Sequence, residues 1–107
     1  MKDVVGIGTL MDLYENLLTE KQKKILNWYI NEDYSLNEIS ELAGITRQAA
    51  HDTIKKSLKL LENFEDTLGL KRHNEDMKEQ LENIKSILNR NGIKIVDGEI
   101  DLLISVL

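Results

Sequence analysis

Two helix-start signals stand on either side of a single glycine, and this arrangement limits the fold more than any other feature of the chain. Ser35 and Glu38 form a capping box, and Gly44 can adopt the positive φ that ends a helix. Thr46 then caps a longer helix. A short helix, a tight turn with glycine and a longer second helix make up a helix-turn-helix. We predict this motif over residues 35–61.

The rest of the chain also predicts helices, because it contains no proline and its apolar residues recur at steps of three and four. The predicted class is all-α, with a helix-turn-helix head over residues 1–68. Residues 69–107 are predicted to form a long C-terminal helix and an apolar tail that together serve as an association surface. A chain this short has only a modest core of its own, which favours help from a partner chain.

Cap residues and apolar stripes set the expected helices. Thr9 is expected to cap the first helix, and Thr19 with Gln22 forms a capping box for the second. Gly69 is expected to interrupt the helix that Thr46 opens, and a further helix is expected over residues 71–90. The predicted buried stripes, in chain order, are Leu10, Leu13, Tyr14, Leu17 and Leu18; Ile25, Leu26, Trp28 or Tyr29, and Ile30; Leu36, Ile39 and Leu42; Ala50, Ile54, Leu58, Leu61, Phe64 and Leu68; and Met77, Leu81, Ile84 and Leu88.

The tail is open to two interpretations. Residues 93–96 alternate, and Asp97-Gly98 is a hairpin turn signal. Ile100, Leu103, Ile104 and Leu107 fit a helix equally well. We favour a short helix after a turn, because an isolated two-stranded hairpin is marginal in water.

The second helix of the motif carries the candidate nucleic-acid-binding residues. Its exposed first turns carry hydrogen-bond donors and acceptors that can pair with base edges in a major groove. Its lysines can contact the phosphates on either side. Residues 47–61 carry a local charge of +3 on a chain of net charge −5. The carboxylate of Asp52 is expected to repel phosphate, unless it accepts a hydrogen bond from the amino group of a cytosine. The predicted contact residues are Thr46, Arg47, Gln48, His51, Asp52, Lys55, Lys56 and Lys59.

The remaining charge pattern predicts a second, protein-facing surface. Residues 62–82 carry a local charge of −4, which is unsuited to phosphate. Together with the stripe of Met77, Leu81, Ile84 and Leu88, this indicates homodimerisation or binding to a basic partner. Packing of the stripe within its own chain is the alternative.

Several function classes are not expected. The chain has no cysteine, and neither His51 nor His73 has another histidine or a cysteine nearby at ligand spacing, so neither a metal nor a cofactor site is predicted. No nucleophile–base pair or phosphate-cradling glycine loop is recognisable, so the protein is not expected to be an enzyme. Trp28, Tyr29 and Tyr34 suit a core better than stacking on single-stranded RNA. With no membrane-length apolar run and no leader pattern, we expect a cytoplasmic protein.

The chain resembles a known family at several points: Leu18-Thr19-Glu20-Lys21-Gln22, Tyr29, Asp33-Tyr34-Ser35-Leu36, Glu38-Ile39, Thr46-Arg47-Gln48-Ala49, Asp52 and Ile54-Lys55-Lys56. These segments resemble the YlxM family of Gram-positive bacteria, and the helix-turn-helix is similar, more distantly, to region 4 of bacterial sigma factors. The resemblance implies a cytoplasmic regulator in the signal recognition particle pathway. By the sigma pattern, Arg47, Gln48, His51 and Asp52 face bases and Lys56 faces the backbone. Where sigma factors often carry Arg or Glu, this chain has Gln48, His51 and Asp52.

Three functional hypotheses follow. The first is a homodimeric binding module of the signal recognition particle pathway, with DNA, the particle's RNA or its GTPase as partner. The second is a sequence-specific transcription regulator in which Arg47 and Gln48 read bases. The third is an adaptor whose helix-turn-helix faces protein rather than nucleic acid.

Overall fold

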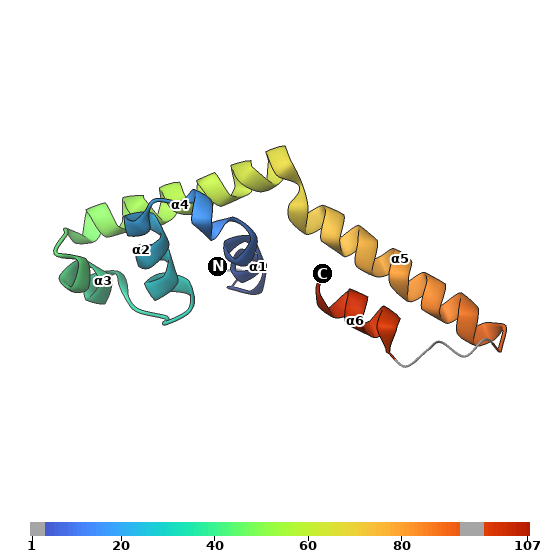
Figure 1. Cartoon of the computed structure of the whole chain (residues 1–107). Helices are drawn as coiled ribbons and strands as arrows, with labels where there is room; N and C mark the ends of the chain where they lie inside the picture. The colour runs from blue at the N-terminus through green and yellow to red at the C-terminus, as the bar shows by residue number, and fades with distance from the viewer. Residues whose placement is uncertain (1–3, 93–97) are drawn as a thin grey trace. The chain divides into compact units, whose positions relative to one another are not determined.

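A computed structural model describes residues 4–92 and 98–107, and every regular element in them is a helix (Figure 1). The prediction of an all-α protein is thus confirmed. In chain order the elements are α1 (Val4–Tyr14), the short 3₁₀ helix η1 (Glu15–Leu17), α2 (Glu20–Ile30), α3 (Leu36–Ala43), α4 (Arg47–Leu68), α5 (Leu70–Arg90) and α6 (Glu99–Ser105). None of the helices in the described ranges is both long and apolar enough to cross a membrane.

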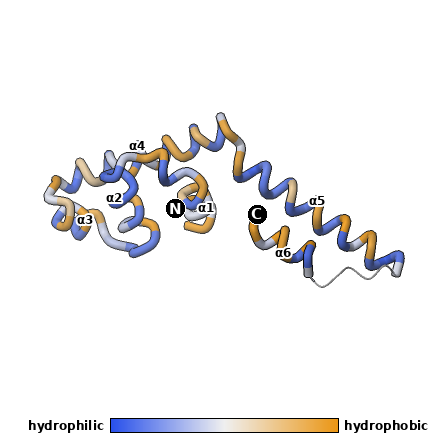
Figure 2. The backbone as a smooth tube through the Cα atoms, in the orientation of Figure 1, coloured by the Kyte–Doolittle hydropathy of each residue, from blue (hydrophilic) through white to orange (hydrophobic). Residues whose placement is uncertain are grey.

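The chain divides into two compact units at Gly69, which ends α4 with a left-handed φ of 63°. We call Met1–Gly69 the head and Leu70–Leu107 the C-terminal unit. In the head, α1, α2 and α3 all pack against α4. Orange and blue alternate along α4 in Figure 2, as expected for a helix with one apolar face. The buried hydrophobic residues of the head are Met11, Tyr14, Leu18, Ile25, Leu26, Ile30, Ile39, Ala50, Ile54 and Leu61.

The first helix differs from its prediction. Thr9 does not cap it but lies inside α1, where its hydroxyl donates to the carbonyl of Val5 at 3.1 Å. The buried stripe also differs from its prediction, both inside α1 and beyond Tyr14, where the tighter 3₁₀ turn of η1 follows. Met11 and Leu18 are buried, whereas Leu17 is 55% exposed.

The other predicted caps are confirmed. Thr19 and Ser35 each accept from the backbone of the third helical residue, and Gln22 and Glu38 return the bond. These reciprocal bonds satisfy backbone N–H groups that a helix start leaves unpaired. Two predicted stripe residues nevertheless lie outside the core, since Leu42 is 57% and Leu68 54% exposed.

The C-terminal unit is a pair of packed helices, α5 and α6. The prediction of a short helix in the tail is confirmed by α6, while the alternating residues 93–96 lie outside the described residues. Neither α5 nor α6 contains a buried residue. Because helix pairs are stabilised mainly by buried apolar faces, this unit has little internal stabilisation.

Candidate nucleic-acid interface

The turn between α3 and α4 is held by local hydrogen bonds. Gly44 adopts φ 67°, and its N–H donates to the carbonyl of Ser40. The N–H of Ile45 donates to the same carbonyl at 3.0 Å, and the side chain of Ile45 packs against the core. Thr46 then caps α4 by accepting from the N–H of Ala49 at 3.0 Å. The motif is therefore a helix-turn-helix with both helix ends satisfied.

The second helix of the motif, α4, has a buried face and an exposed face. Ala50, Ile54, Ser57 and Leu61 form the buried face. Ser57 was not predicted there. Its hydroxyl donates to the carbonyl of Thr53 at 2.6 Å, so this polar group is satisfied within the helix. Every predicted contact residue is exposed, namely Thr46, Arg47, Gln48, His51, Asp52, Lys55, Lys56 and Lys59.

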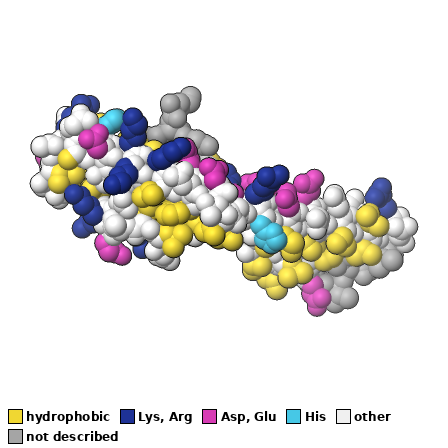
Figure 3. All heavy atoms as spheres, turned by 90° about the horizontal axis from the view of Figure 1, so that it is seen from above, with side chains coloured by type: hydrophobic (Ala, Val, Ile, Leu, Met, Phe, Trp, Pro, Cys, Tyr) yellow, Lys and Arg dark blue, Asp and Glu magenta, His cyan; other side chains and the backbone are white. Residues whose placement is uncertain are grey.

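Most of the cations on this exposed face have no partner within the described ranges. Lys59 lies 3.7 Å from the carboxylate of Glu62. The side chains of Arg47, Lys55 and Lys56 make no hydrogen bond or ion pair among residues 4–92 and 98–107. Lys55, Lys56 and Lys59 line one shallow depression of about 340 Å³ together with Asp52 and Leu60. Dark-blue Lys and Arg side chains are visible over the head in Figure 3. Such cations are available to an anionic ligand.

Asp52 interacts with its neighbours on the same helix. The amide nitrogen of Gln48 donates to its carboxylate at 2.9 Å, and Nδ1 of His51 lies 3.6 Å from the same oxygen. A Gln–Asp bond one turn apart is typical of helix surfaces. The carboxylate thus lies between two of the predicted base-facing residues and orients the amide of Gln48.

The aromatic residues of the head support its core. Trp28, Tyr29 and Tyr34 are half-buried and pack against the hydrophobic cluster. The ammonium group of Lys24 lies 5.2 Å from the Trp28 ring centroid, a cation–π arrangement. Their placement agrees with the core assignment rather than with an exposed stacking platform.

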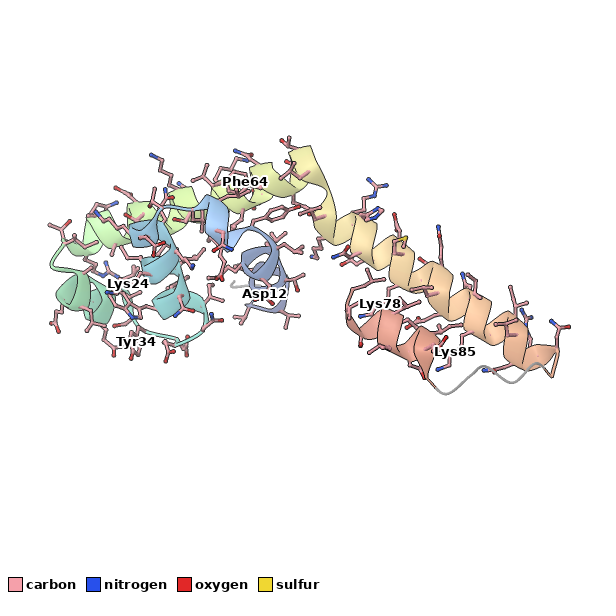
Figure 4. All side chains as sticks on the ribbon, in the orientation of Figure 1. Asp12, Lys24, Tyr34, Phe64, Lys78 and Lys85 are labelled. Carbon is pink, nitrogen blue, oxygen red and sulfur yellow. The ribbon has the colours of Figure 1, made fainter. Side chains whose placement is uncertain are left out.

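The predicted dimer residues fall into two pairs that differ in how exposed their side chains are. Leu81 and Leu88 are half-buried, whereas Met77 and Ile84 are 38% and 48% exposed. Lys85, which follows Ile84, forms an ion pair with Asp101 of α6 and faces that helix in Figure 4. Sequence reasoning missed Ile87, which is 47% exposed, although its step of three from Ile84 could have revealed it.

No group of three or more metal-ligating side chains occurs among the residues that the structure describes. The charged group that lies closest to the His51 ring in the described ion pairs is the carboxylate of Asp52. His73 lies exposed on α5.

Comparisons with known proteins agree with this geometry. Residues 1–97 match the model of a family described as "Putative helix-turn-helix protein, YlxM / p13 like". A UPF0122 protein of Clostridium novyi is 49% identical over 77 residues, which cover 72% of this chain and 67% of that protein. A second, from Thermoanaerobacter sp., is 42% identical over 94 residues, covering 88% and 76%. A third, from Clostridium kluyveri, is 39% identical over 101 residues and covers 91% of both chains. The resemblance inferred from the sequence is confirmed, and the chain belongs to the YlxM / p13-like family of helix-turn-helix proteins.

Proposed function

We propose that the head is a nucleic-acid-binding module and that the exposed face of α4 is its binding surface. The observation that carries this proposal is the set of exposed cations, Arg47, Lys55 and Lys56, which have no partner within the described residues. Phosphate is the anion that a helix-turn-helix ordinarily meets. The net charge of the whole chain is −5, so the attraction must be confined to this helix.

The residues of α4 divide by their proposed role. Lys55, Lys56 and Lys59 lie roughly two and a half to three and a half turns beyond the Thr46 cap and would contact phosphates. Arg47 and Gln48, in the first turn, are the residues that can pair with guanine and adenine edges. In this proposal Asp52 orients Gln48 and also weakens contact with phosphate, which lowers sequence-independent affinity.

The family resemblance extends the proposal to the signal recognition particle pathway, in the cytoplasm. The particle contains both an RNA and a GTPase, and the basic face of α4 suits the RNA. The acidic side chains of α5 suit a basic protein surface instead. Glu75, Asp76, Glu79 and Glu82 are exposed, and three of them, Glu75, Glu79 and Glu82, follow one another at helical spacing.

We also propose that the protein is a homodimer formed through the C-terminal unit. Hydrophobic side chains gather along one side of this unit in Figure 3. Since Leu81 and Leu88 are partly covered, the accessible apolar strip consists of Met77, Ile84 and Ile87, with Leu103 exposed on α6. By the helical repeat, Glu75, Glu79 and Glu82 lie on the opposite side of α5 from Met77 and Ile84, whereas Asp76 lies on the same side as Ile87, at the edge of the strip.

A binding screen tests the proposal. Random-sequence duplex DNA, signal recognition particle RNA and the particle's GTPase are titrated with the purified protein at several salt concentrations. We expect salt-dependent binding to a nucleic acid, lost in the double variant Lys55→Glu/Lys56→Glu. Lys78→Glu, on α5, is a control for a single charge reversal outside α4 and should bind normally.

Each other outcome has a defined meaning. Strong preference for one DNA sequence would favour the transcription-regulator hypothesis. Binding to the GTPase alone, unchanged in the double variant, would support the adaptor hypothesis and reject nucleic-acid binding by α4.

A further inference from the structure

A second recess in the head opens between all four of its α-helices. Ile7 of α1, Tyr29 of α2 and Leu36 of α3 form three of its walls, and Ile54 and Leu58 of α4 form the fourth. Its volume is about 390 Å³, within the range of roughly 300–1,000 Å³ that ligand pockets occupy. We call it the head groove.

The head groove combines an apolar floor with a cationic rim. Ile54 is only 5% exposed, so the floor reaches the hydrophobic core. Two further residues of α4, His51 and Lys55, complete the lining that the described residues form, and no carboxylate occurs among these lining residues. Lys55 has no hydrogen-bond or ion-pair partner among the described residues. The charge at the rim is therefore positive, and no described lining residue compensates it.

We propose that the head groove is a binding site for a small organic anion with an apolar body, such as an aliphatic or aromatic carboxylate. The apolar part would be removed from water by Ile7, Leu36 and Leu58, which gives the hydrophobic contribution. The carboxylate would lie at the rim and interact with Lys55. A cationic ligand would meet Lys55 as a like charge and is disfavoured by the same arrangement.

A ligand in this groove would also affect the neighbouring surface, a step that rests on the function proposed above. Lys55 belongs both to the groove and to the depression shared with Lys56 and Lys59. A carboxylate bound at Lys55 would neutralise a charge otherwise offered to phosphate. Linkage then requires that the anion lower nucleic-acid affinity and that nucleic acid lower anion affinity by the same factor.

The test uses octanoate as the probe and octanol as its uncharged counterpart, with the full chain labelled at its Ile and Leu methyl groups for NMR titration. We expect saturable shifts of the Ile7, Leu36, Ile54 and Leu58 methyls with octanoate, and weaker binding of octanol. Lys55→Ala should weaken octanoate binding about two- to fivefold, the effect of losing one exposed charge contact. Lys56→Ala, the adjacent exposed lysine outside the groove, should leave it unchanged.

A filled groove provides an independent check. Leu58→Phe adds volume at the wall and should abolish octanoate binding, with circular dichroism and the methyl spectrum confirming that the head still folds. If that variant unfolds, Leu36→Phe serves the same purpose from α3.

Four results would overturn the proposal. Two concern the location of binding: octanoate causes no saturable shift, or it shifts only methyls of the C-terminal unit. Two concern charge: octanol and octanoate bind with equal affinity, or Lys55→Ala and Lys56→Ala lose equal affinity for octanoate. Shifts of the groove methyls that depend on protein concentration without any probe would instead identify a second chain as the occupant. If the protein binds octanoate but no nucleic acid, the proposed site in the head groove stands, and only its coupling to nucleic-acid binding is rejected.

Discussion

The hydroxyl of Tyr14 on α1 donates a hydrogen bond of 2.7 Å to the carboxylate of Glu65 on α4. Tyr14 is 1% exposed, and its ring centroid lies 6.0 Å from that of Phe64, which Figure 4 shows on α4. The tyrosine therefore joins α1 to the last turns of α4 by both an aromatic contact and a charged hydrogen bond. This contact anchors the helix that forms the Ile7 wall of the head groove.

Replacing Tyr14 with Phe should therefore destabilise the head. The variant keeps the ring but removes the donor to a partly buried carboxylate, at a cost of about 1–2 kcal/mol in the free energy of unfolding. Urea denaturation followed by circular dichroism measures it. Tyr34→Phe is the control, since the Tyr34 hydroxyl makes no hydrogen bond among the described residues, and should change stability by less than about 0.5 kcal/mol. Equal losses in both variants would contradict a specific role for the Tyr14–Glu65 bond.

Two glycines should respond to alanine in opposite directions. Gly44 has φ 67°, and although a Cβ there would touch nothing within 4 Å, the left-handed conformation itself costs about 1–2 kcal/mol for alanine. Gly8 lies within α1, and its Cβ would also meet nothing within 4 Å. Gly8→Ala should stabilise the protein by roughly 0.5–1 kcal/mol through helix propensity. Thermal unfolding of the two variants side by side checks the signs, and a stabilising Gly44→Ala would be incompatible with the described turn.

Single lysine substitutions should change the salt dependence of nucleic-acid binding. If Lys55 and Lys56 each contact a phosphate, replacing either with Ala should reduce the slope of log affinity against log salt by roughly 1. Fluorescence anisotropy with labelled duplex or RNA at a series of salt concentrations gives the slope. Lys78→Ala on α5 should leave it unchanged, and a slope that falls equally in all three variants would assign the effect to net charge rather than to contacts.

A charge placed on the apolar strip of α5 should prevent dimerisation. Ile84 is 48% exposed at the centre of this strip, and Ile84→Lys should raise the dimer dissociation constant by at least about tenfold. Asn83→Lys adds the same charge at the adjacent exposed position and should preserve the dimer. Sedimentation equilibrium distinguishes the two. Two monomeric variants, or a monomeric unaltered protein, would reject the proposed interface.

Local sequence signals proved sufficient where a few adjacent residues determine the geometry. Ser35 with Glu38, Thr46 and Gly44 each act through bonds or backbone preferences within one turn, so their roles in the helix-turn-helix could be predicted without the fold. The prediction that Thr9 caps the first helix was wrong, because the residues around it do not determine its role. A threonine can cap a helix or bond back to the preceding turn inside one, and only the actual start at Val4 decides between them.

The sequence by itself determined the all-helical class, the family, the caps and turn of the helix-turn-helix and the concentration of positive charge on α4. These follow from short-range periodicity, caps and composition. The tertiary structure alone decided which apolar residues are covered, as with Leu42 and Leu68, which stay exposed, and Leu81, which is partly covered. It also brought Tyr14 to Glu65 and assembled the head groove from four helices. The physical reason is that burial and long-range hydrogen bonds depend on how helices meet, whereas helix starts and ends depend on neighbours in the chain.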